Sequence, residues 1–265
     1  MVKKEISFRV FGLVYLLIAT AIVAYPLFLT LMRSLENDGF GNYTYVLSKV
    51  NIFRNFWNSV RVTGVTLIGV GFICSLGAFA FSKLNFRGRN VLFVFVLMGI
   101  LIPTSATIFP LFQVIKMLKL VNNPLSQTLP YITTNSIFGL LLLKLYFDGL
   151  PDEMMESARI DGAGSFRIFA RIMLPNALPG FSILFVNTFK GAWNEFQIAI
   201  TFVTRREYFT MAALPINFRG TEGSYQNVIS ALFACLIMCI IPVIVFYILA
   251  QKLIIKGMTE GAIKG

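Results

Sequence analysis

Histidine is absent from this 265-residue sequence, and charged residues make up only 13% of it. The absence of histidine removes the commonest general base and the commonest metal ligand of enzymes, so the sequence argues against a hydrolytic enzyme. Soluble domains carry about 25% charged residues, whereas 57% of the residues here are hydrophobic. The composition therefore predicts a protein that lies in a membrane.

Cysteine is also scarce. Cys74, Cys235 and Cys239 all lie within apolar runs, where they form neither a disulfide framework nor a metal-ligand spacing, and we interpret them as packing residues. The sequence contains no Gly-Lys dipeptide, which excludes the phosphate-binding P-loop pattern G-x-x-x-x-G-K-[ST]. The net charge of +11 comes from scattered basic residues rather than from one block, so we expect no nucleic-acid binding.

Six apolar stretches reach the roughly 20 residues that a helix needs to cross a bilayer. They predict an all-α integral membrane protein, a single domain over 1–265, with six transmembrane helices at about 10–32, 59–81, 91–115, 125–146, 176–203 and 227–250. The first stretch begins like a signal peptide, but its apolar run continues well past the sequence that resembles a cleavage site. We therefore expect an uncleaved first span.

The distribution of basic residues predicts the orientation of the chain. An even number of spans places both termini on the same side of the membrane. With the termini inside, the inner segments 1–9, 82–90, 147–175 and 251–265 hold twelve lysines or arginines, and the outer segments 33–58, 116–124 and 204–226 hold eight. The positive-inside rule then favours cytoplasmic termini, with a cytoplasmic loop at 147–175 and a cytoplasmic tail at 251–265.

The loop at 147–175 has the pattern of a helix–turn–helix. Pro151 suits a first helical position, and Gly162 is placed to end that helix with a positive φ. A second helix is expected from about Ser165 until Pro175 closes it. Its expected apolar face comprises Phe166, Phe169, Ile172 and Met173. Such a loop suits docking into another protein, and the alternative is that it lies flat on lipid headgroups.

The same loop carries a spaced signature: E-A-A, three residues, G, nine residues, I, one residue, L-P. The matching positions, in register throughout, are Glu156, Ser157, Ala158, Gly162, Ile172, Leu174 and Pro175, with Ser157 in place of the first alanine. This pattern resembles the signature of the membrane subunits of binding-protein-dependent ABC importers. The resemblance implies a type I importer fold in which this segment, including Asp161, is a coupling helix that sits in a cleft of a separate ATPase subunit.

The resemblance extends along most of the chain. The stretches FRGRN, LIPTSATIFPLF, WNEF and GMTEGAIKG are similar to those of the carbohydrate-uptake branch, in its shorter permease type, typified by the smaller membrane subunit of maltose importers. The resemblance implies no cofactor on this chain, with ATP and Mg bound by two partner ATP-binding subunits. It also implies a second permease subunit, an extracytoplasmic sugar-binding protein and a location in the inner membrane of a bacterial-type cell.

The predicted fifth span contains polar side chains. A charge near the bilayer centre costs about 3 kcal/mol on insertion scales, so these side chains should face protein or water. The candidates for a substrate path are Asn187, Trp193, Asn194 and Glu195, and the alternative is that they are polar contacts between helices. Lys190 lies five residues before Glu195, a poor spacing for a pair within one helix, so we expect each to have a partner elsewhere.

The sequence thus predicts a permease subunit, not an enzyme, that moves a sugar or oligosaccharide into the cell by alternating access. One alternative is an ABC permease for another solute, such as an amino acid, a phosphonate or a polyol phosphate. The other is an ion-coupled secondary transporter that uses Lys190 and Glu195, which leaves the spacing of residues 156–175 unexplained.

Overall fold

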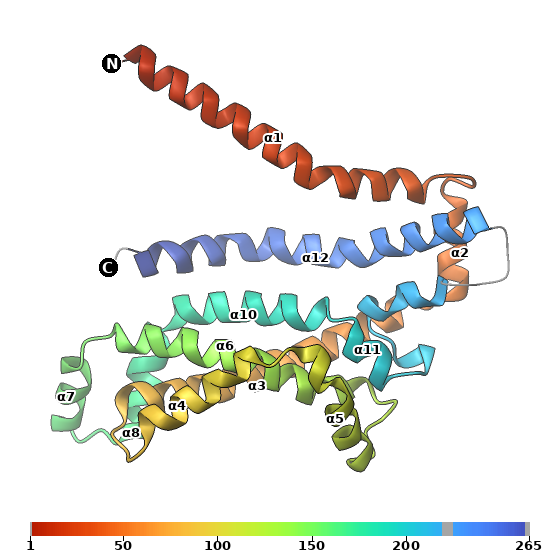
Figure 1. The fold of residues 1–265 in the computed structure, drawn as a ribbon. Coiled ribbons are helices and arrows are strands. Elements are labelled where there is room, and N and C mark those ends of the chain that lie inside the picture. Colours follow the sequence, from red (N-terminus) through yellow and green to blue (C-terminus); the bar gives the residue numbers. More distant parts are fainter. Residues whose placement is uncertain (1, 219–224, 263–265) are drawn as a thin grey trace. The chain divides into compact units, whose positions relative to one another are not determined.

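The regular elements of the protein are helical. The computed structural model describes residues 2–218 and 225–262, with side chains described for 10–123, 125–218 and 228–251. Within these ranges no strand occurs, which confirms the all-α prediction (Figure 1). Helices suit a chain that lies in lipid, because each helix satisfies its own backbone hydrogen bonds without water.

The elements follow one another without long connections. The longest helices are α1 (Val2–Ser34), α3 (Ile52–Lys83), α6 (Thr128–Asp148), α10 (Leu178–Trp193) and α12 (Tyr225–Ala262). The shorter ones are α2 (Gly41–Lys49), α4 (Arg89–Leu97), α5 (Thr104–Met117), α7 (Glu153–Ile160), α8 (Ser165–Ile168), α9 (Leu174–Asn176) and α11 (Gln197–Phe202). The 3-10 segments are η1 (Met98–Leu101), η2 (Pro124–Gln127), η4 (Arg206–Tyr208) and η5 (Met211–Phe218), and η3 (Phe169–Met173) is a π-helix.

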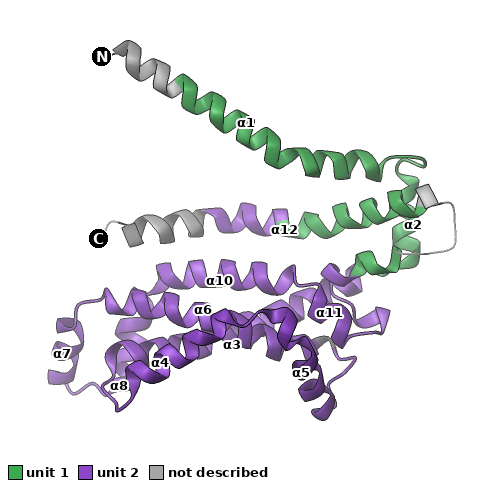
Figure 2. Ribbon diagram, viewed as in Figure 1, with its two compact units in different colours: residues 1–51, 214–243 green, residues 52–213, 244–265 purple. Residues whose placement is uncertain are grey.

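The chain divides into two compact units, coloured in Figure 2. One comprises residues 1–51 and 214–243, and the other comprises residues 52–213 and 244–265, so that α12 contributes to both. The single domain over 1–265 stays a prediction. The second unit contains the signature loop and all the residues proposed for a substrate path.

Several helices have the length and apolarity of membrane spans. By these criteria three qualify among the described residues: Val10–Ser34, Ile52–Lys83 and Val228–Gln251. They coincide with the predicted first, second and sixth spans. Two bent pairs, Arg89–Leu101 with Thr104–Met117 and Ser165–Asn176 with Leu178–Trp193, bring the number to five if each pair is one span. The 21-residue α6 occupies the place of the predicted fourth span.

Two predicted spans are not single helices. The third, predicted over 91–115, bends by 104° between η1 and α5, where Pro103 lacks a backbone N–H and disfavours a helical residue before it. The fifth, predicted over 176–203, ends at Trp193 and resumes only at Gln197. Continuous helix was the wrong expectation there, because the Glu195 carboxylate accepts hydrogen bonds from backbone N–H groups that begin α11.

Glycines allow the central helices of the second unit to approach closely. A Cβ on Gly139 of α6 would lie 2.6 Å from Leu184 Cδ1 on α10 and 2.7 Å from Cys74 Sγ on α3. The side chains of Leu184 and Cys74 are both buried, so neither has room to withdraw. Small residues thus bring α3, α6 and α10 into direct contact, as in other membrane helix bundles.

Asparagines near the start of α3 hold a distant loop by its backbone. Asn55 Nδ2 donates to the carbonyl of Phe209 at 2.8 Å, and Asn58 Nδ2 donates to the carbonyl of Glu207 at 3.0 Å. Ser59 Oγ accepts from the N–H of Met211 at 2.7 Å. These bonds satisfy backbone groups between η4 and η5 that lie outside regular helix, and they tie this loop to the end of α3 remote from the signature loop.

The close approach at Gly139 generates a prediction. Gly139→Ala should lower the midpoint of thermal unfolding of the detergent-solubilised complex, because overpacking typically costs about 1–3 kcal/mol. Gly64→Ala in α3 is the matched control, since a Cβ there meets nothing within 4 Å. Its midpoint should be unchanged or higher, because alanine favours helix over glycine. Equal shifts in the two variants would contradict this account of the packing.

Candidate functional site

The first helix of the signature loop ends in a defined turn. Gly162 has a φ of +79°, as the sequence predicts. The N–H of Gly162 donates to the carbonyl of Arg159 at 3.0 Å, and the N–H of Ala163 donates to the carbonyl of Ala158 at 2.9 Å. These two bonds form a Schellman cap, which requires a left-handed residue at the glycine position. The helix itself begins at Glu153 rather than at Pro151.

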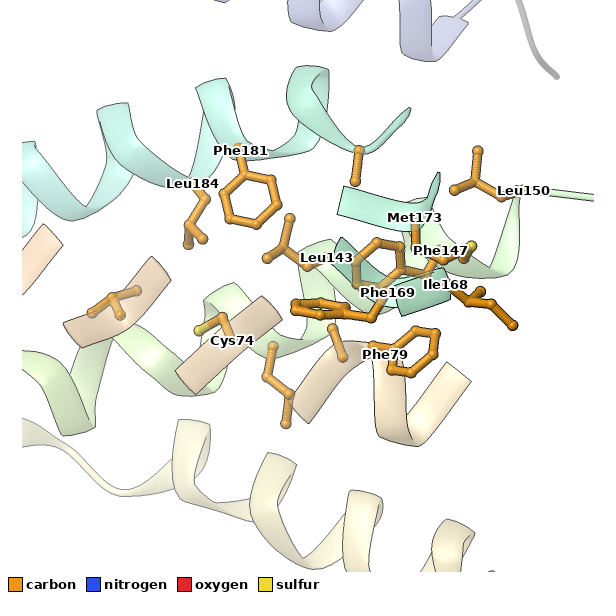
Figure 3. Packing of buried hydrophobic residues seen from close by; sticks show 14 of the residues in the cluster. Cys74, Phe79, Leu143, Phe147, Leu150, Ile168, Phe169, Met173, Phe181 and Leu184 are labelled. Carbon is orange, nitrogen blue, oxygen red and sulfur yellow. The ribbon is translucent and has the colours of Figure 1, made fainter. Parts of the chain in front are cut away.

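The loop is packed into the core of its unit. Met155 from α7, Ile168 from α8, and Phe169 and Met173 from η3 belong to one buried cluster with residues of α3, α6 and α10 (Figure 3). The ring of Phe169 lies 5.3 Å, between centroids, from the ring of Phe79 on α3. The loop is therefore a covering layer of the helix bundle and not a free hairpin.

The predicted apolar face of the second loop helix is partly wrong. Phe166 is 75% exposed, whereas Ile168, which was not assigned to that face, is 1% exposed. Phe166 lies in the short helix α8, and although its ring is 6.2 Å, between centroids, from that of Phe169, most of it stays outside the buried cluster. Nor does Pro175 close the helix, because it occupies the first turn of α9 and the next helix begins at Leu178.

The signature residues separate into an exposed set and a half-buried set. The exposed residues are Glu156, Ser157, Asp161, Gly162 and Pro175. The half-buried residues are Ala158, Ile172 and Leu174. Ala158 and Leu174 pack against the buried cluster. The structure therefore brings the signature residues together on one loop, but only the first set is available to a partner.

Sequence reasoning missed two exposed apolar side chains on this loop. Ile160, at the end of α7, is 87% exposed, and Phe166, at the start of α8, is 75% exposed. They flank the turn at Gly162 on either side in the sequence. The signal for Ile160 was present, since Ile160 lies outside the apolar side formed by Met154, Met155 and Ala158. Large apolar side chains in such a position mark a contact surface.

A charged cluster fixes the start of the loop to the end of α3. Lys83 Nζ donates to Asp152 Oδ1 at 2.6 Å and to the carbonyl of Leu150 at 2.8 Å. Ser82 Oγ donates to Asp148 Oδ1 at 2.6 Å. The hydrogen bond and the charge of Lys83 hold the pKa of the Asp152 carboxyl below its usual value. Because the Lys83 side chain is only 5% exposed, its ammonium stays directed at these acceptors.

A cavity of about 230 Å³ lies between α6 and α10. Its lining residues are Thr134, Asn135, Phe138, Leu184, Asn187, Thr188, Lys190 and Gly191. Asn187 is the residue of the predicted path that reaches this cavity. A Cβ on Gly191 would lie 2.6 Å from Asn135 Oδ1, so glycine is needed for the close approach of the two helices here. The cavity wall is mostly apolar, with the polar groups of Thr134, Asn135, Asn187, Thr188 and Lys190 set into it.

The other predicted path residues lie elsewhere. Trp193 is buried, and its ring stacks on that of Phe189 with centroids 5.1 Å apart. Asn194 is exposed at the end of α10, where its Nδ2 donates to the carbonyl of Lys190 at 3.1 Å. The structure therefore does not gather Asn187, Trp193, Asn194 and Glu195 around one space, and their role in a path stays a prediction.

Glu195 has a partner elsewhere in the chain, as expected from the sequence, and also backbone partners that were not predicted. Its Oε1 accepts from the N–H of Gln197 at 3.0 Å, and its Oε2 accepts from the N–H of Ile198 at 2.8 Å. The Tyr131 hydroxyl of α6 donates to Oε2 at 3.0 Å. The carboxylate thus caps α11 and joins it to α6. Lys190 has no acidic partner within the part of the chain whose side chains are described.

Comparison with known proteins places this site in context. Residues 68–260 match the family described as binding-protein-dependent transport system inner membrane component. The chain is 32% identical over 227 residues to the arabinooligosaccharides transport system permease protein AraQ of Bacillus subtilis (strain 168), covering 85% of this chain and 79% of the relative. It is 30% identical over 226 residues to the trehalose/maltose transport system permease protein MalG of Thermococcus litoralis, covering 84% and 81%.

The fold is also found among solved structures. The crystal structure of a bacterial ABC transporter involved in the import of the acidic polysaccharide alginate matches with a TM-score of 0.77 at 22% identity. The match covers 93% of this chain and 97% of that chain. At this identity the likeness shows a shared fold.

The contact between Lys83 and Asp152 generates a second prediction. In Lys83→Met, trypsin should cut after Arg159 about 2- to 5-fold faster, the size of effect expected for a partly exposed ion pair. Arg87→Met is the matched control, because Arg87 is exposed in the neighbouring loop. The pKa of Asp152 is lowered by folding, so this contact is complete above the ordinary value of about 3.9 and is lost only as the pH falls through the lower folded value. The ratio of the cleavage rate of Lys83→Met to that of wild type should therefore be the same at pH 7 and pH 8.5. Equal cleavage rates of Lys83→Met and wild type would show that the contact between Lys83 and Asp152 does not hold the loop in place.

The cap at Glu195 generates a third prediction. Glu195→Ala should destabilise the chain by about 1–2 kcal/mol, because it removes a helix cap and a hydrogen-bond acceptor of Tyr131. Asn194→Ala, at the adjacent exposed position, should change stability by less than about 0.5 kcal/mol. Denaturant unfolding of the solubilised complex measures both changes. If Glu195→Ala impairs transport with unchanged stability, the carboxylate acts on the solute and the capping role is wrong.

Proposed function

Because the chain belongs to the family of inner membrane components of binding-protein-dependent transport systems, we propose that it is a permease subunit of an ABC importer for sugars or oligosaccharides. The observation that carries the proposal is the signature loop, which lies within the residues matched by the family and folds as a capped helix rooted in the bundle. The printed names of the relatives, which concern arabinooligosaccharides and trehalose or maltose, support a carbohydrate solute.

The proposed topology has six spans. The bent pair of α4 and α5 forms the third span, α6 the fourth, and α10 with the segments that flank it the fifth. Both termini and the signature loop then lie in the cytoplasm, as the distribution of basic residues favours. Multi-pass insertion in a bacterial-type inner membrane follows from this topology.

The proposed mechanism needs no chemistry on this chain. ATP and Mg are bound and used by two separate ATPase subunits, and this chain pairs with a second permease subunit. A binding protein delivers the sugar from outside, an expectation supported by a structural relative crystallised as an alginate transporter in complex with an alginate pentasaccharide-bound periplasmic protein. Alternating access then moves the solute through a path between the permease subunits.

In this mechanism the signature loop is the coupling element. Ile160 and Phe166 project from the loop, and Glu156 and Asp161 are exposed beside them. An apolar pair with polar surroundings is the usual composition of a protein contact surface. An ATPase that moves this surface also moves Phe169 and Met173, which lie inside the core shared with α3, α6 and α10.

The function is tested on the assembled complex. The tagged chain is purified from its native membrane, its partners are identified, and sugars are screened for stimulation of ATP hydrolysis in the presence of the binding protein. Co-purification of two ATPase subunits and stimulation by a saccharide are the expected results. Stimulation by a solute of another class, with saccharides inactive, would overturn the carbohydrate assignment.

The exposed apolar pair generates a fourth prediction. Ile160→Asp and Phe166→Asp should each weaken retention of the ATPase subunits by more than 10-fold, because loss of a central hot-spot contact costs at least about 2 kcal/mol and a tenfold change corresponds to about 1.4 kcal/mol. Both side chains are exposed in the chain itself, so the amount of inserted permease should not change. Phe40→Asp is the matched control, since Phe40 is 79% exposed in a segment predicted to lie outside the cell.

The two variants also separate docking from lipid binding. If the loop lies on lipid headgroups, Ile160→Asp and Phe166→Asp should leave retention of the ATPase subunits unchanged. That result would show that the loop is not the coupling element. Ala158 is a poorer probe of docking, because it packs against the chain's own buried cluster and a charge there would disturb the fold.

A further inference from the structure

The cavity between α6 and α10 has an uncompensated positive charge. Lys190 lines it together with Thr134, Asn135, Asn187 and Thr188, and its lining contains no aspartate or glutamate. A lysine within a membrane span is costly unless it pairs with an acid or faces a water-filled space. The cavity provides that space, so Lys190 does not need a structural partner to be tolerated there.

Glu195, the acidic residue nearest to Lys190 in the sequence, already has hydrogen-bond partners. Both carboxylate oxygens of Glu195 accept backbone N–H groups of α11, and one of them also accepts the hydroxyl of Tyr131. Among the described residues no ion pair includes Lys190, whereas Lys83 on α3 and Lys144 on α6 are both paired. Lys190, which lines the cavity and is exposed, thus has no carboxylate partner among the residues whose side chains are described.

A second group in the same wall lacks a partner. Thr188 is 1% exposed, lines the cavity, and its Oγ1 has no hydrogen-bond partner among the described residues. A buried hydroxyl without a partner is unfavourable, and such groups are commonly completed by a ligand or an ordered water. Together with the amide of Asn187, the wall offers one ammonium, one unused hydroxyl and one amide within a single helical stretch of α10.

We propose that this cavity receives the acidic group of an anionic saccharide, and that Lys190 determines the preference for it. This proposal rests on the proposed carbohydrate import. A carboxylate forms short, charge-assisted hydrogen bonds with an ammonium, whereas the hydroxyl of a neutral sugar leaves the charge of Lys190 uncompensated. The solute is therefore of the uronate type, and its hydroxyls are bound by Thr188 and Asn187.

The test compares two probes of the same skeleton. Trigalacturonate and its fully methyl-esterified form differ in charge but not in ring or linkage. Their binding to the purified, nucleotide-free complex, without the binding protein, is measured by calorimetry at low salt. We expect trigalacturonate to bind at least 10-fold more tightly than the ester, and this preference to decrease as salt is raised.

Variants assign the preference to one residue. Lys190→Gln should remove the preference for the acid and leave binding of the ester within about twofold, while Lys190→Arg should retain the preference. Lys116→Gln, at an exposed lysine of α5, is the control and should behave as wild type. Equal binding of the two probes by wild type, or an unchanged preference in Lys190→Gln, would overturn the proposal.

Three further outcomes are distinguishable. If Lys190→Gln dissociates the second permease subunit, Lys190 pairs with an acid of that subunit and the proposal is wrong. If neutral oligosaccharides stimulate ATP hydrolysis equally in wild type and Lys190→Gln while the acid does not, the proposal fails and carbohydrate import stands. If no saccharide of either kind stimulates hydrolysis, carbohydrate import fails as well.

Discussion

The insertion of Phe169 and Met173 into the core of α3, α6 and α10 is the interaction on which the other features depend. Burial of one large apolar side chain contributes roughly 1.5–3 kcal/mol, enough to hold a short polar helix such as α7 that could not persist alone. Protein cores are close-packed and transmit displacement. A force applied to the loop is therefore transmitted to α3, α6 and α10 through these packed side chains, without any further connection between loop and bundle.

The signature loop is held at its start by charged contacts and at its end by apolar packing. Lys83 orients its beginning through Asp152 and the Leu150 carbonyl, and the buried Phe169 holds its end. Asp152 is largely exposed and screened by solvent, so the ion pair orients the start of the loop but adds little to the stability of the fold. The segment between these anchors is the turn at Gly162, and it is also the part with exposed apolar side chains. A surface held at both ends loses little conformational freedom when a partner binds, which favours tight docking.

The sequence was sufficient for local features with a strong chemical cause. The spacing around Gly162 predicts its positive φ because only a left-handed residue allows that cap, and long apolar runs predict helices because lipid offers no hydrogen bonds. Composition could not predict the break after Trp193, because polar residues such as Asn194 and Glu195 are equally compatible with a continuous span that faces protein or water. The break depends on the Glu195 carboxylate accepting the N–H groups of Gln197 and Ile198 while it also meets Tyr131 of α6. The exposed position of Phe166 depends on which side of α8 packs on the core, and the sequence, in which Phe166 and Ile168 are both large and apolar, does not show which of them is covered.

Helix α10 connects the signature loop to the cavity. The segment Ser165–Asn176 meets α10 at an angle of 75°, and α10 begins at Leu178, directly after the signature. Lys190 lies twelve residues further along the same helix, or about 18 Å at 1.5 Å per residue. A tilt applied at the loop is thus delivered to the cavity wall by one rigid helix, without a relay of side chains. Gly139, where a Cβ would lie 2.6 Å from the buried Leu184 of α10 and 2.7 Å from the buried Cys74 of α3, is a point at which that tilt meets resistance, because close-packed contacts leave little space for compression.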